Sequence, residues 1–426
     1  MLQEIRIKNF LSFKDEVKFS FEASGDKFAE DYQVVKINDN VRLLRFAVVY
    51  GYNASGKSNL LRVFDFLSDF WSEQKDLDDE TGDILFKLDN NSANEHSYFD
   101  LIFYVGSTKY CYNLELDRHS VYLEKLSYYR STQPIMLFER KLVDNQSAIT
   151  FGSSLKISNV VKEGITLWCL KNTSFFVARN KVNVSIPLID AAKDWMKKHV
   201  MRNITPMTRL THYAQRKLSE NAELAGYIVD FLNAADFNIT DINSKEVEGK
   251  IPDDVLKLML TDDKIPDDIK RRITDDQQIK EVKTFIEHTV ENENGMETYL
   301  MDLDNDEEST GTLRTLGIEA ALYQALRTDS FLGIDEIETS LHPKLLEKIL
   351  FEYLKSHSKS QILVTTHNDG LLDLVDDLIR KDSVWFTEKK KSGVTDLYKL
   401  TDFKGVNRLS SIREAYRNKR FGATMK

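Results

Sequence analysis

A glycine-bearing loop lies between an apolar segment and a helix-forming one, and few folds accommodate such a loop. Residues 46–50 are apolar, and the stretch from Gly51 to Ser58 follows the spacing Gly-x-x-x-x-Gly-Lys-Ser. This is the phosphate-loop pattern, in which glycines let the backbone curl so that its N–H groups face phosphate oxygens. A helix beginning near Lys57 adds the positive end of its dipole. The sequence therefore predicts a strand, loop and helix that bind a nucleoside triphosphate.

Each residue type in the loop has a role in that chemistry. The Lys57 ammonium is expected between the β- and γ-phosphates, and the Ser58 hydroxyl is expected to be a ligand of Mg²⁺. The pattern also matches a plain strand-to-helix turn, but the strand, the helix, Lys57 and Ser58 together favour the phosphate loop. The predicted nucleotide-binding residues of the loop are Asn53, Ala54, Ser55, Gly56, Lys57, Ser58 and Asn59.

Composition indicates a chain that folds in water. Its 426 residues are 42% hydrophobic and 30% charged. No apolar run reaches the roughly 18 residues of a membrane span. The first residues alternate polar and apolar, which predicts a strand and not a secretion signal. Two cysteines, Cys111 and Cys169, are too few for a disulfide framework or a zinc site. We therefore expect a cytoplasmic protein with no membrane partner.

Acidic residues are concentrated in one segment. The net charge is −10, and residues 241–310 hold 21 acidic against 9 basic residues. An acidic chain is a poor candidate for nonspecific coating of duplex DNA, because the DNA phosphates attract basic surfaces. The balance is compatible with a local basic groove or with a basic protein partner.

Hydrophobic periodicity divides the chain into three predicted domains and gives an α/β fold class. Residues 1–155 alternate with period two outside the phosphate-loop helix, which predicts an antiparallel β subdomain. Residues 156–295 read as a mainly helical, acidic insertion, with helix starts of the form Ile-Pro-Asp-Asp at 251–254 and 265–268. Residues 296–426 alternate strands and helices, including helices at 313–326 and 370–379, which predicts a parallel sheet with helix cover.

Two acids follow the apolar segment 331–334. In phosphate-loop enzymes a strand-end carboxylate in the position of Asp335 holds the magnesium shell, and the next residue, Glu336, polarises the attacking water. A simpler reading is that both acids only terminate a strand. Lys57 and Asp335 are 278 positions apart. Because small GTPases separate these groups by only a few dozen positions, the spacing indicates a core interrupted by inserted material.

Three segments carry a family resemblance: residues 51–59, residues 335–343 and the Thr-Thr-His-Asn stretch at 365–368. Together they resemble the RecF/SMC/OLD branch of ABC ATPases, and most of all the bacterial abortive-infection ATPases that lack a TOPRIM domain. Residues 411–423 also resemble the C-terminus of that subgroup. The likeness covers residues 1–130 and 300–426. It implies an ABC-type P-loop NTPase head with an inserted domain, and ATP and Mg²⁺ as cofactors.

The resemblance assigns further site residues. Ser309 and Gly311 stand where the ABC signature would bind a γ-phosphate across a dimer interface, although only a Ser and a Gly of the usual Leu-Ser-Gly-Gly form are present. Ser309 is alternatively a helix N-cap. His342 belongs to the loop that would cross the dimer interface, or else lies on the surface at a helix start. His367 would contact the γ-phosphate as the switch histidine, unless it merely ends a strand.

The resemblance implies an ATP-dependent switch that works as a homodimer or higher oligomer in anti-phage defence. The sequence shows no nuclease motif, so a separately encoded nuclease or toxin is the expected effector, and DNA or a phage protein is the expected trigger. The alternative is a RecF/SMC-like DNA-binding ATPase of repair or maintenance, in which basic residues such as Arg413 and Arg417 contact phosphates. A stand-alone kinase or GTPase is disfavoured by the wide spacing and by the Thr-Thr-His-Asn stretch.

Overall fold

The computed structural model describes residues 1–235, 238–250, 256–257, 278–293, 295–303 and 308–424. They form two compact units. The first unit contains residues 1–208, 324–339 and 346–426, and the second contains residues 209–323 and 340–345. The predicted segment 156–295 is therefore shared between the units. Its first three helices belong to the first unit, and the rest belongs to the second.

A seven-stranded antiparallel sheet of order β10-β9-β8-β7-β6-β1-β2 occupies the first unit. Hairpins join β1 to β2 and β9 to β10. Helices α2 to α5 bring apolar side chains into the same core as this sheet, including Trp71, Phe176 and Trp195. The strands are β1 (Leu2–Lys8), β2 (Val17–Ser20), β6 (Ser97–Val105), β7 (Thr108–Leu116), β8 (Val121–Tyr129), β9 (Pro134–Val143) and β10 (Gln146–Phe151). The helices are α2 (Lys57–Ser72), α3 (Asn159–Trp168), α4 (Phe175–Arg179) and α5 (Pro187–His199).

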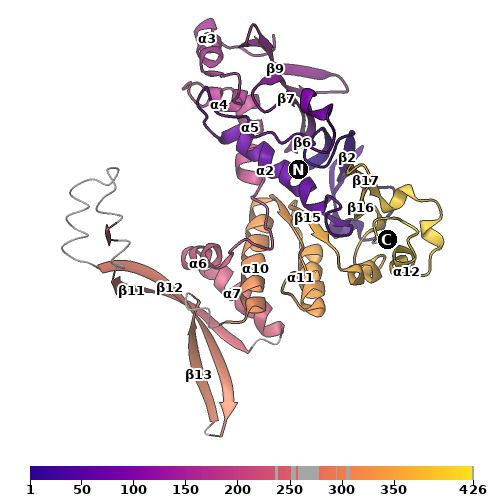
Figure 1. The fold of residues 1–426 in the computed structure, drawn as a ribbon. Coiled ribbons are helices and arrows are strands. Elements are labelled where there is room, and N and C mark those ends of the chain that lie inside the picture. The colour runs from indigo at the N-terminus through magenta and orange to yellow at the C-terminus, as the bar shows by residue number, and fades with distance from the viewer. Residues whose placement is uncertain (236–237, 251–255, 258–277, 294, 304–307, 425–426) are drawn as a thin grey trace. The chain divides into compact units, whose positions relative to one another are not determined.

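A second sheet of the first unit has the order β14-β15-β5-β16-β17. The first four strands are parallel and β17 is antiparallel to β16. This confirms the parallel sheet expected for the C-terminal part, with β5 of the phosphate loop at its centre (Figure 1). The elements are β5 (Phe46–Tyr50), β14 (Phe331–Ile334), α11 (Pro343–Lys355), β15 (Gln361–Thr366), β16 (Val384–Lys389), β17 (Thr395–Lys399) and α12 (Ile412–Arg417). The mixture of sheets and helices confirms the α/β fold class.

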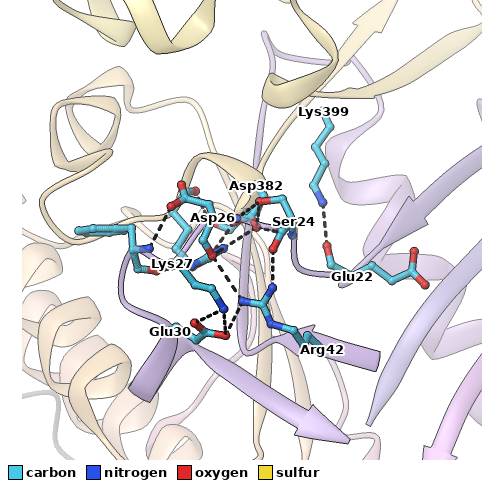
Figure 2. A network of polar contacts seen from close by, with 11 residues as sticks. Glu22, Ser24, Asp26, Lys27, Glu30, Arg42, Asp382 and Lys399 are labelled. Carbon is cyan, nitrogen blue, oxygen red and sulfur yellow. Dashed lines mark hydrogen bonds and ion pairs between the residues drawn. The ribbon is translucent and has the colours of Figure 1, made fainter. Parts of the chain in front are cut away.

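Polar contacts fix the segment between β2 and β5 to the C-terminal strands. The Ser24 hydroxyl and backbone N–H both donate to Asp382 at 2.7 Å, and Arg42 donates to the Ser24 carbonyl at 2.9 Å (Figure 2). Lys399 donates to the Glu22 carbonyl at 3.2 Å. The segment contains α1 (Glu30–Gln33), β3 (Val34–Asn38) and β4 (Val41–Leu44), and the last two pair as a hairpin. The chain that leads into the phosphate-loop strand is therefore anchored to residues near the opposite end of the sequence.

The second unit combines helices with a three-stranded antiparallel sheet of order β11-β12-β13, drawn in salmon in Figure 1. Helices α6 and α7 contact β11, and α6 also contacts β12. The elements are α6 (Thr211–Glu220), α7 (Ala222–Ala234), β11 (Ile239–Lys250), β12 (Gln278–Asn292), β13 (Gly295–Asp302) and most of α10 (Thr310–Thr328).

Two expectations on secondary structure are wrong. The acidic segment that begins at Ile239 was expected to be helical, but it forms β11, because it pairs with β12 along its length. The predicted helix 370–379 is only a 3₁₀ turn, η3 (Asp369–Leu374), whose first turn is capped by the Asn368 side chain. The two Ile-Pro-Asp-Asp helix starts lie outside the described residues. Among the described residues, no helix is both long and apolar enough to span a bilayer.

Candidate nucleotide-binding site

The parallel register of the second sheet brings three sequence motifs to one edge. Ile334 of β14 is aligned with Val364 of β15, and Thr366 of β15 with Tyr50 of β5. The carboxyl ends of these strands therefore lie side by side. In open α/β sheets, ligands bind outside the carboxyl ends of the strands. The residues that follow the three strands are Asp335, His367 and Gly51.

The phosphate loop adopts a conformation that its glycines permit. Gly56 has a φ of +108°, in the left-handed region, and it is the residue before the first turn of α2. A Cβ at Gly56 would collide with the Thr395 side chain, and a Cβ at Gly51 would come within 2.8 Å of the Thr387 carbonyl oxygen. Ala54 also has a positive φ of 63°. The loop thus needs glycine at both ends, for close approach at Gly51 and for close approach and backbone angle at Gly56.

Residues far away in the sequence hold the phosphate loop in place through side-chain hydrogen bonds. The hydroxyls of Ser55 and Thr387 lie 2.7 Å apart, and the Thr395 hydroxyl donates to the Ser55 carbonyl at 2.8 Å. Ser12 receives hydrogen bonds from Thr395 at 2.9 Å and from the Asn59 side chain at 2.8 Å. Ser55 is buried and Asn59 half-buried, whereas Asn53 and Ala54 at the tip are exposed. The nucleotide-binding roles of these four residues stay predictions.

Lys57 lies at the base of the loop and is buried. Its ammonium donates to the carbonyl oxygens of Gly51 at 2.8 Å and Tyr52 at 3.3 Å. Burial lowers the pKa of Lys57, and the carboxylates of Glu336 and Asp335 oppose this shift. The positive charge is thus held inside the loop, facing the acids that follow β14.

Ser58 and Asp335 meet although they are far apart in the chain. The Ser58 hydroxyl donates to Asp335 Oδ1 at 3.0 Å, and the Thr365 hydroxyl donates to the same oxygen at 2.5 Å. The Thr365 hydroxyl also accepts from the Glu336 backbone N–H at 2.9 Å, and Glu336 has a positive φ of 46°. Thr365 therefore fixes the backbone that presents both acids. The structure places the predicted pair Ser58 and Asp335 together.

His367 is oriented by Glu338. The imidazole Nδ1 lies 3.0 Å from Glu338 Oε1, and the His367 backbone N–H donates to the same oxygen at 2.8 Å. Glu338 is almost buried, whereas half of the His367 side chain is exposed. Because Nδ1 is engaged, Nε2 is the imidazole nitrogen available to another group.

The residues at this edge fit a magnesium–nucleotide complex. The Ser58 hydroxyl and the Asp335 carboxylate are hard oxygen donors 3.0 Å apart. Magnesium in nucleotide sites is held by one or two protein oxygens, together with phosphate oxygens and water. No cluster of three or more carboxylate, histidine or cysteine side chains suited to a metal occurs among the described residues. The donor set therefore suits a cation that arrives with phosphates.

The remaining predicted residues belong to the second unit. Ser309 precedes α10, and its hydroxyl accepts from the Thr312 backbone N–H at 3.1 Å, so it is a helix N-cap as the simpler alternative foresaw. A Cβ at Gly311 would come within 3.1 Å of the Ser340 carbonyl oxygen. His342 is exposed, and its Nδ1 accepts from the Lys344 backbone N–H at 3.3 Å. The γ-phosphate role of Ser309 and Gly311 and the place of His342 in a loop across a dimer interface stay predictions.

Sequence reasoning missed the residues that support the loop: Ser12, Thr387 and Thr395. They lie in or beside strands that join the site only through tertiary structure, and a single Ser or Thr in a strand carries no local signal. Thr365 belongs to the Thr-Thr-His-Asn stretch at 365–368, but its hydrogen bonds to Asp335 and to the Glu336 backbone were not predicted. The available sign was its position at the end of an apolar strand, two residues before His367.

Comparison with known proteins agrees with the phosphate-loop reading. A family model described as "AAA domain, putative AbiEii toxin, Type IV TA system" matches residues 46–153 and 214–373. No curated protein matches the chain.

Solved structures with a similar chain course include two SMC heads. The SMC head domain from Thermotoga maritima aligns over 93% of this chain and 98% of its own, with 13% identity and a TM-score of 0.41. A crystal structure of the SmcHead bound to the C-winged helix domain of ScpA aligns over 98% of this chain and 99% of its own, with 11% identity and a TM-score of 0.44. The family match spans more than half of the sequence and includes the phosphate loop and both acids. The chain therefore belongs to the family of AAA-type ATPase domains described as putative AbiEii toxin, Type IV TA system.

Proposed function

We propose that the chain binds ATP with Mg²⁺ and hydrolyses it to ADP and phosphate. The observation that carries this proposal is the 3.0 Å contact between the Ser58 hydroxyl and Asp335, because it joins the phosphate loop to the strand-end acids. Lys57 and the N–H groups of the loop would bind the phosphates. When bound, Mg²⁺ would neutralise phosphate charge and polarise the phosphoryl group.

Glu336 and His367 are the proposed catalytic residues. Glu336 accepts a proton from the attacking water, and its backbone is held in place by Thr365. The Nε2 of His367 is directed by the contact of Nδ1 with Glu338 and would stabilise charge on the γ-phosphate. Loss of a positioned base lowers the rate by a factor of about 10² to 10⁴.

Nucleotide binding and hydrolysis are tested separately. Glu336→Gln is expected to bind Mg²⁺–ATP with the affinity of the wild type and to lower kcat by about 10² or more, measured by phosphate release. Glu352→Gln, on the exposed side of α11, is the matched control and is expected to change neither quantity. If Glu336→Gln turns over at the normal rate, the base lies elsewhere, and Glu338 becomes the next candidate.

We further propose that two chains bind ATP between them, each with its own phosphate loop and the Ser309–Gly311 segment of its partner. Complementation tests this arrangement. Lys57→Ala inactivates one phosphate loop and Ser309→Arg inactivates one signature segment, so neither variant hydrolyses ATP alone. A mixture of the two forms one intact composite site per dimer and recovers part of the activity. If the mixture stays inactive while each variant remains folded, the shared site is refuted.

The proposed biological role is that of a sensor or regulator in anti-phage defence, with closure and reopening of the dimer controlling an effector. The description of the matched family as a putative toxin of a Type IV TA system supports a defence-type role. A separately encoded nuclease or toxin is proposed as the effector, because the sequence carries no nuclease motif. This assignment fails if the purified chain, free of other proteins, cuts DNA or RNA in the presence of magnesium.

The alternative of a RecF/SMC-like DNA-binding ATPase loses part of its support. Arg413 and Arg417, two of the basic residues assigned to DNA phosphates, form ion pairs with Asp369 instead. A DNA titration at several salt concentrations decides between the roles. A DNA clamp requires steeply salt-dependent affinity and ATPase activity that DNA stimulates.

A further inference from the structure

The C-terminal helix α12 is tied to the turn that follows His367. Arg413 Nε donates to Asp369 Oδ1 at 3.0 Å, and its NH1 donates to Asp373 Oδ2 at 2.5 Å. Arg417 donates to Asp369 through Nε at 2.5 Å and through NH2 at 3.1 Å. Asp369 therefore accepts from both arginines. Bidentate charge-assisted contacts of this kind restrict geometry more than a single exposed ion pair does.

The turn η3 is short: it buries Leu371 and Leu372, and its partly exposed start at Asp369 is held by polar contacts to α12. It is a 3₁₀ helix of six residues that begins two positions after His367. Hydrogen bonds in 3₁₀ helices have poorer geometry than those of α-helices, so such short turns depend on outside contacts. Arg413 and Arg417 supply such contacts at its first residue, Asp369.

Burial raises the pKa of Asp369, but the hydrogen bonds and charges of Arg417 and Arg413 outweigh burial and hold it below its ordinary value. The carboxylate thus stays ionised at neutral pH, and its contacts with both arginines persist.

Helix α12 is itself fixed to the centre of the parallel sheet. Tyr416 is buried, its ring stacks on Phe386 of β16 with a centroid distance of 5.6 Å, and it lies 6.0 Å from the ring of Tyr50. Its hydroxyl donates to the Ala423 carbonyl at 2.9 Å. Tyr50 is the last residue of β5 and immediately precedes Gly51. Tyr416 therefore anchors α12 beside the strand that leads into the phosphate loop.

We propose that Arg413 and Arg417 are positioning residues, which act through Asp369 to keep His367 in register with the phosphate loop. The proposal rests on the proposed hydrolysis of ATP. The segment of His367 is then held at two points: Glu338 binds its backbone N–H and Nδ1, and α12 binds the following turn. Neither arginine belongs to the residues proposed to bind the nucleotide, so their loss is expected to misplace the imidazole and to leave the phosphate loop intact.

Asp369→Asn tests the proposal, because it removes the charge with little change of shape. We expect an unchanged Kd for Mg²⁺–ATP and a fall in kcat of about tenfold, within the roughly 10²-fold that a small misplacement can cost. Arg413→Ala combined with Arg417→Ala should give the same fall. The matched control is Arg118→Ala, which removes another surface arginine–carboxylate pair, that with Glu80 at 2.6 Å, and should leave kcat unchanged.

A double-mutant cycle with His367 separates positioning from general loosening. In a His367→Ala background, Asp369→Asn should cause no further fall in kcat, because the residue through which it acts is gone. An equal fall in both backgrounds, or an unchanged kcat in the wild-type background, overturns the proposal.

Amide hydrogen exchange gives a readout that does not depend on turnover. Asp369→Asn should accelerate exchange of residues 367–374 and leave that of α2 unchanged. If amide exchange in this segment is unchanged, α12 does not hold the turn, and the proposal is refuted. If the wild type hydrolyses no ATP, the proposed function fails, and hydrogen exchange still decides whether α12 holds the turn.

Discussion

Replacement of Lys57 by methionine separates the charge of the phosphate loop from its packing. Methionine keeps most of the length and apolar volume of the side chain but removes the ammonium. In the wild type that ammonium donates to the carbonyls of Gly51 and Tyr52. These carbonyls lose a partner in Lys57→Met, so the free protein is destabilised by about 1–3 kcal/mol per buried group. The informative quantity is therefore the increase in stability that the ligand causes, measured for each protein against the same protein without ligand.

The expected size of the effect follows from one charge-assisted contact with a phosphate. Such hydrogen bonds contribute about 1.5–3 kcal/mol, so Lys57→Met should raise the Kd for Mg²⁺–ATP by roughly 10- to 150-fold. At a ligand concentration of 100 times the wild-type Kd, binding stabilises the wild type by about 2.7 kcal/mol. At the same concentration the variant should gain only about 0.3 to 1.3 kcal/mol.

Thermal unfolding with a non-hydrolysable ATP analogue and Mg²⁺ measures this difference. With an unfolding entropy of about 2.1 cal/mol/K per residue, the wild type should gain about 3 °C and the variant about 1.5 °C or less. Lys198→Met is the matched control, because Lys198 is an exposed lysine of α5 paired with Asp194. Its ligand-induced shift should equal that of the wild type. If Lys57→Met shows the full shift, the ammonium does not bind the phosphates, and the assignment of the loop is refuted.

Three further predictions concern buried charges and the switch histidine. Burial raises the pKa of Asp83 from 3.8 to about 7, against the lowering effect of its hydrogen bond with the Ser97 hydroxyl. The free energy of unfolding should therefore fall as pH rises from about 4 to 7. In urea unfolding at several pH values, Asp83→Asn should remove this dependence. Glu124→Gln leaves the fully buried side chain of Arg140 without its carboxylate partner. Unfolding in guanidinium chloride should show that the free energy of unfolding is lower by about 3–5 kcal/mol. Glu338→Gln should lower kcat by about tenfold with little change in ATP affinity, since a small misplacement of a catalytic group costs up to about 10²-fold.

The sequence was most informative where local pattern and tertiary role coincide. The phosphate loop needs glycine at two fixed positions, and both requirements are visible in the sequence and in the backbone. The boundaries predicted for β14, 331–334, are those observed, because a short apolar run followed by two acids has few other interpretations. Local sequence patterns were therefore sufficient to predict both the phosphate loop and the acid pair Asp335 and Glu336.

Prediction failed where pairing partners decide the structure. The segment Ile239–Lys250 is rich in polar and acidic residues, and Ile239 and Ile242 are the buried apolar side chains among those described in it. Its strand conformation depends on alignment with β12, about 40 positions later, which no local pattern shows. The same reasoning applies to Thr387 and Thr395, whose hydroxyls support the phosphate loop only because β16 and β17 are placed beside it.

The order of the parallel sheet explains how distant motifs form one site. The sheet neighbours β14, β15 and β5 end at the same edge, so Ser58 and Asp335, 277 positions apart in the chain, form a hydrogen bond. Backbone contacts set this geometry as much as side chains do: the Asp335 N–H donates to the Ile204 carbonyl at 2.7 Å, on the side of β14 away from β15. A substitution that shifts residues 200–204 should therefore disturb the carboxylate of Asp335 without touching the phosphate loop. Insertion of one glycine after Arg202 is expected to lower kcat more than it weakens ATP binding, and equal losses in both would show that the edge is not organised by this contact.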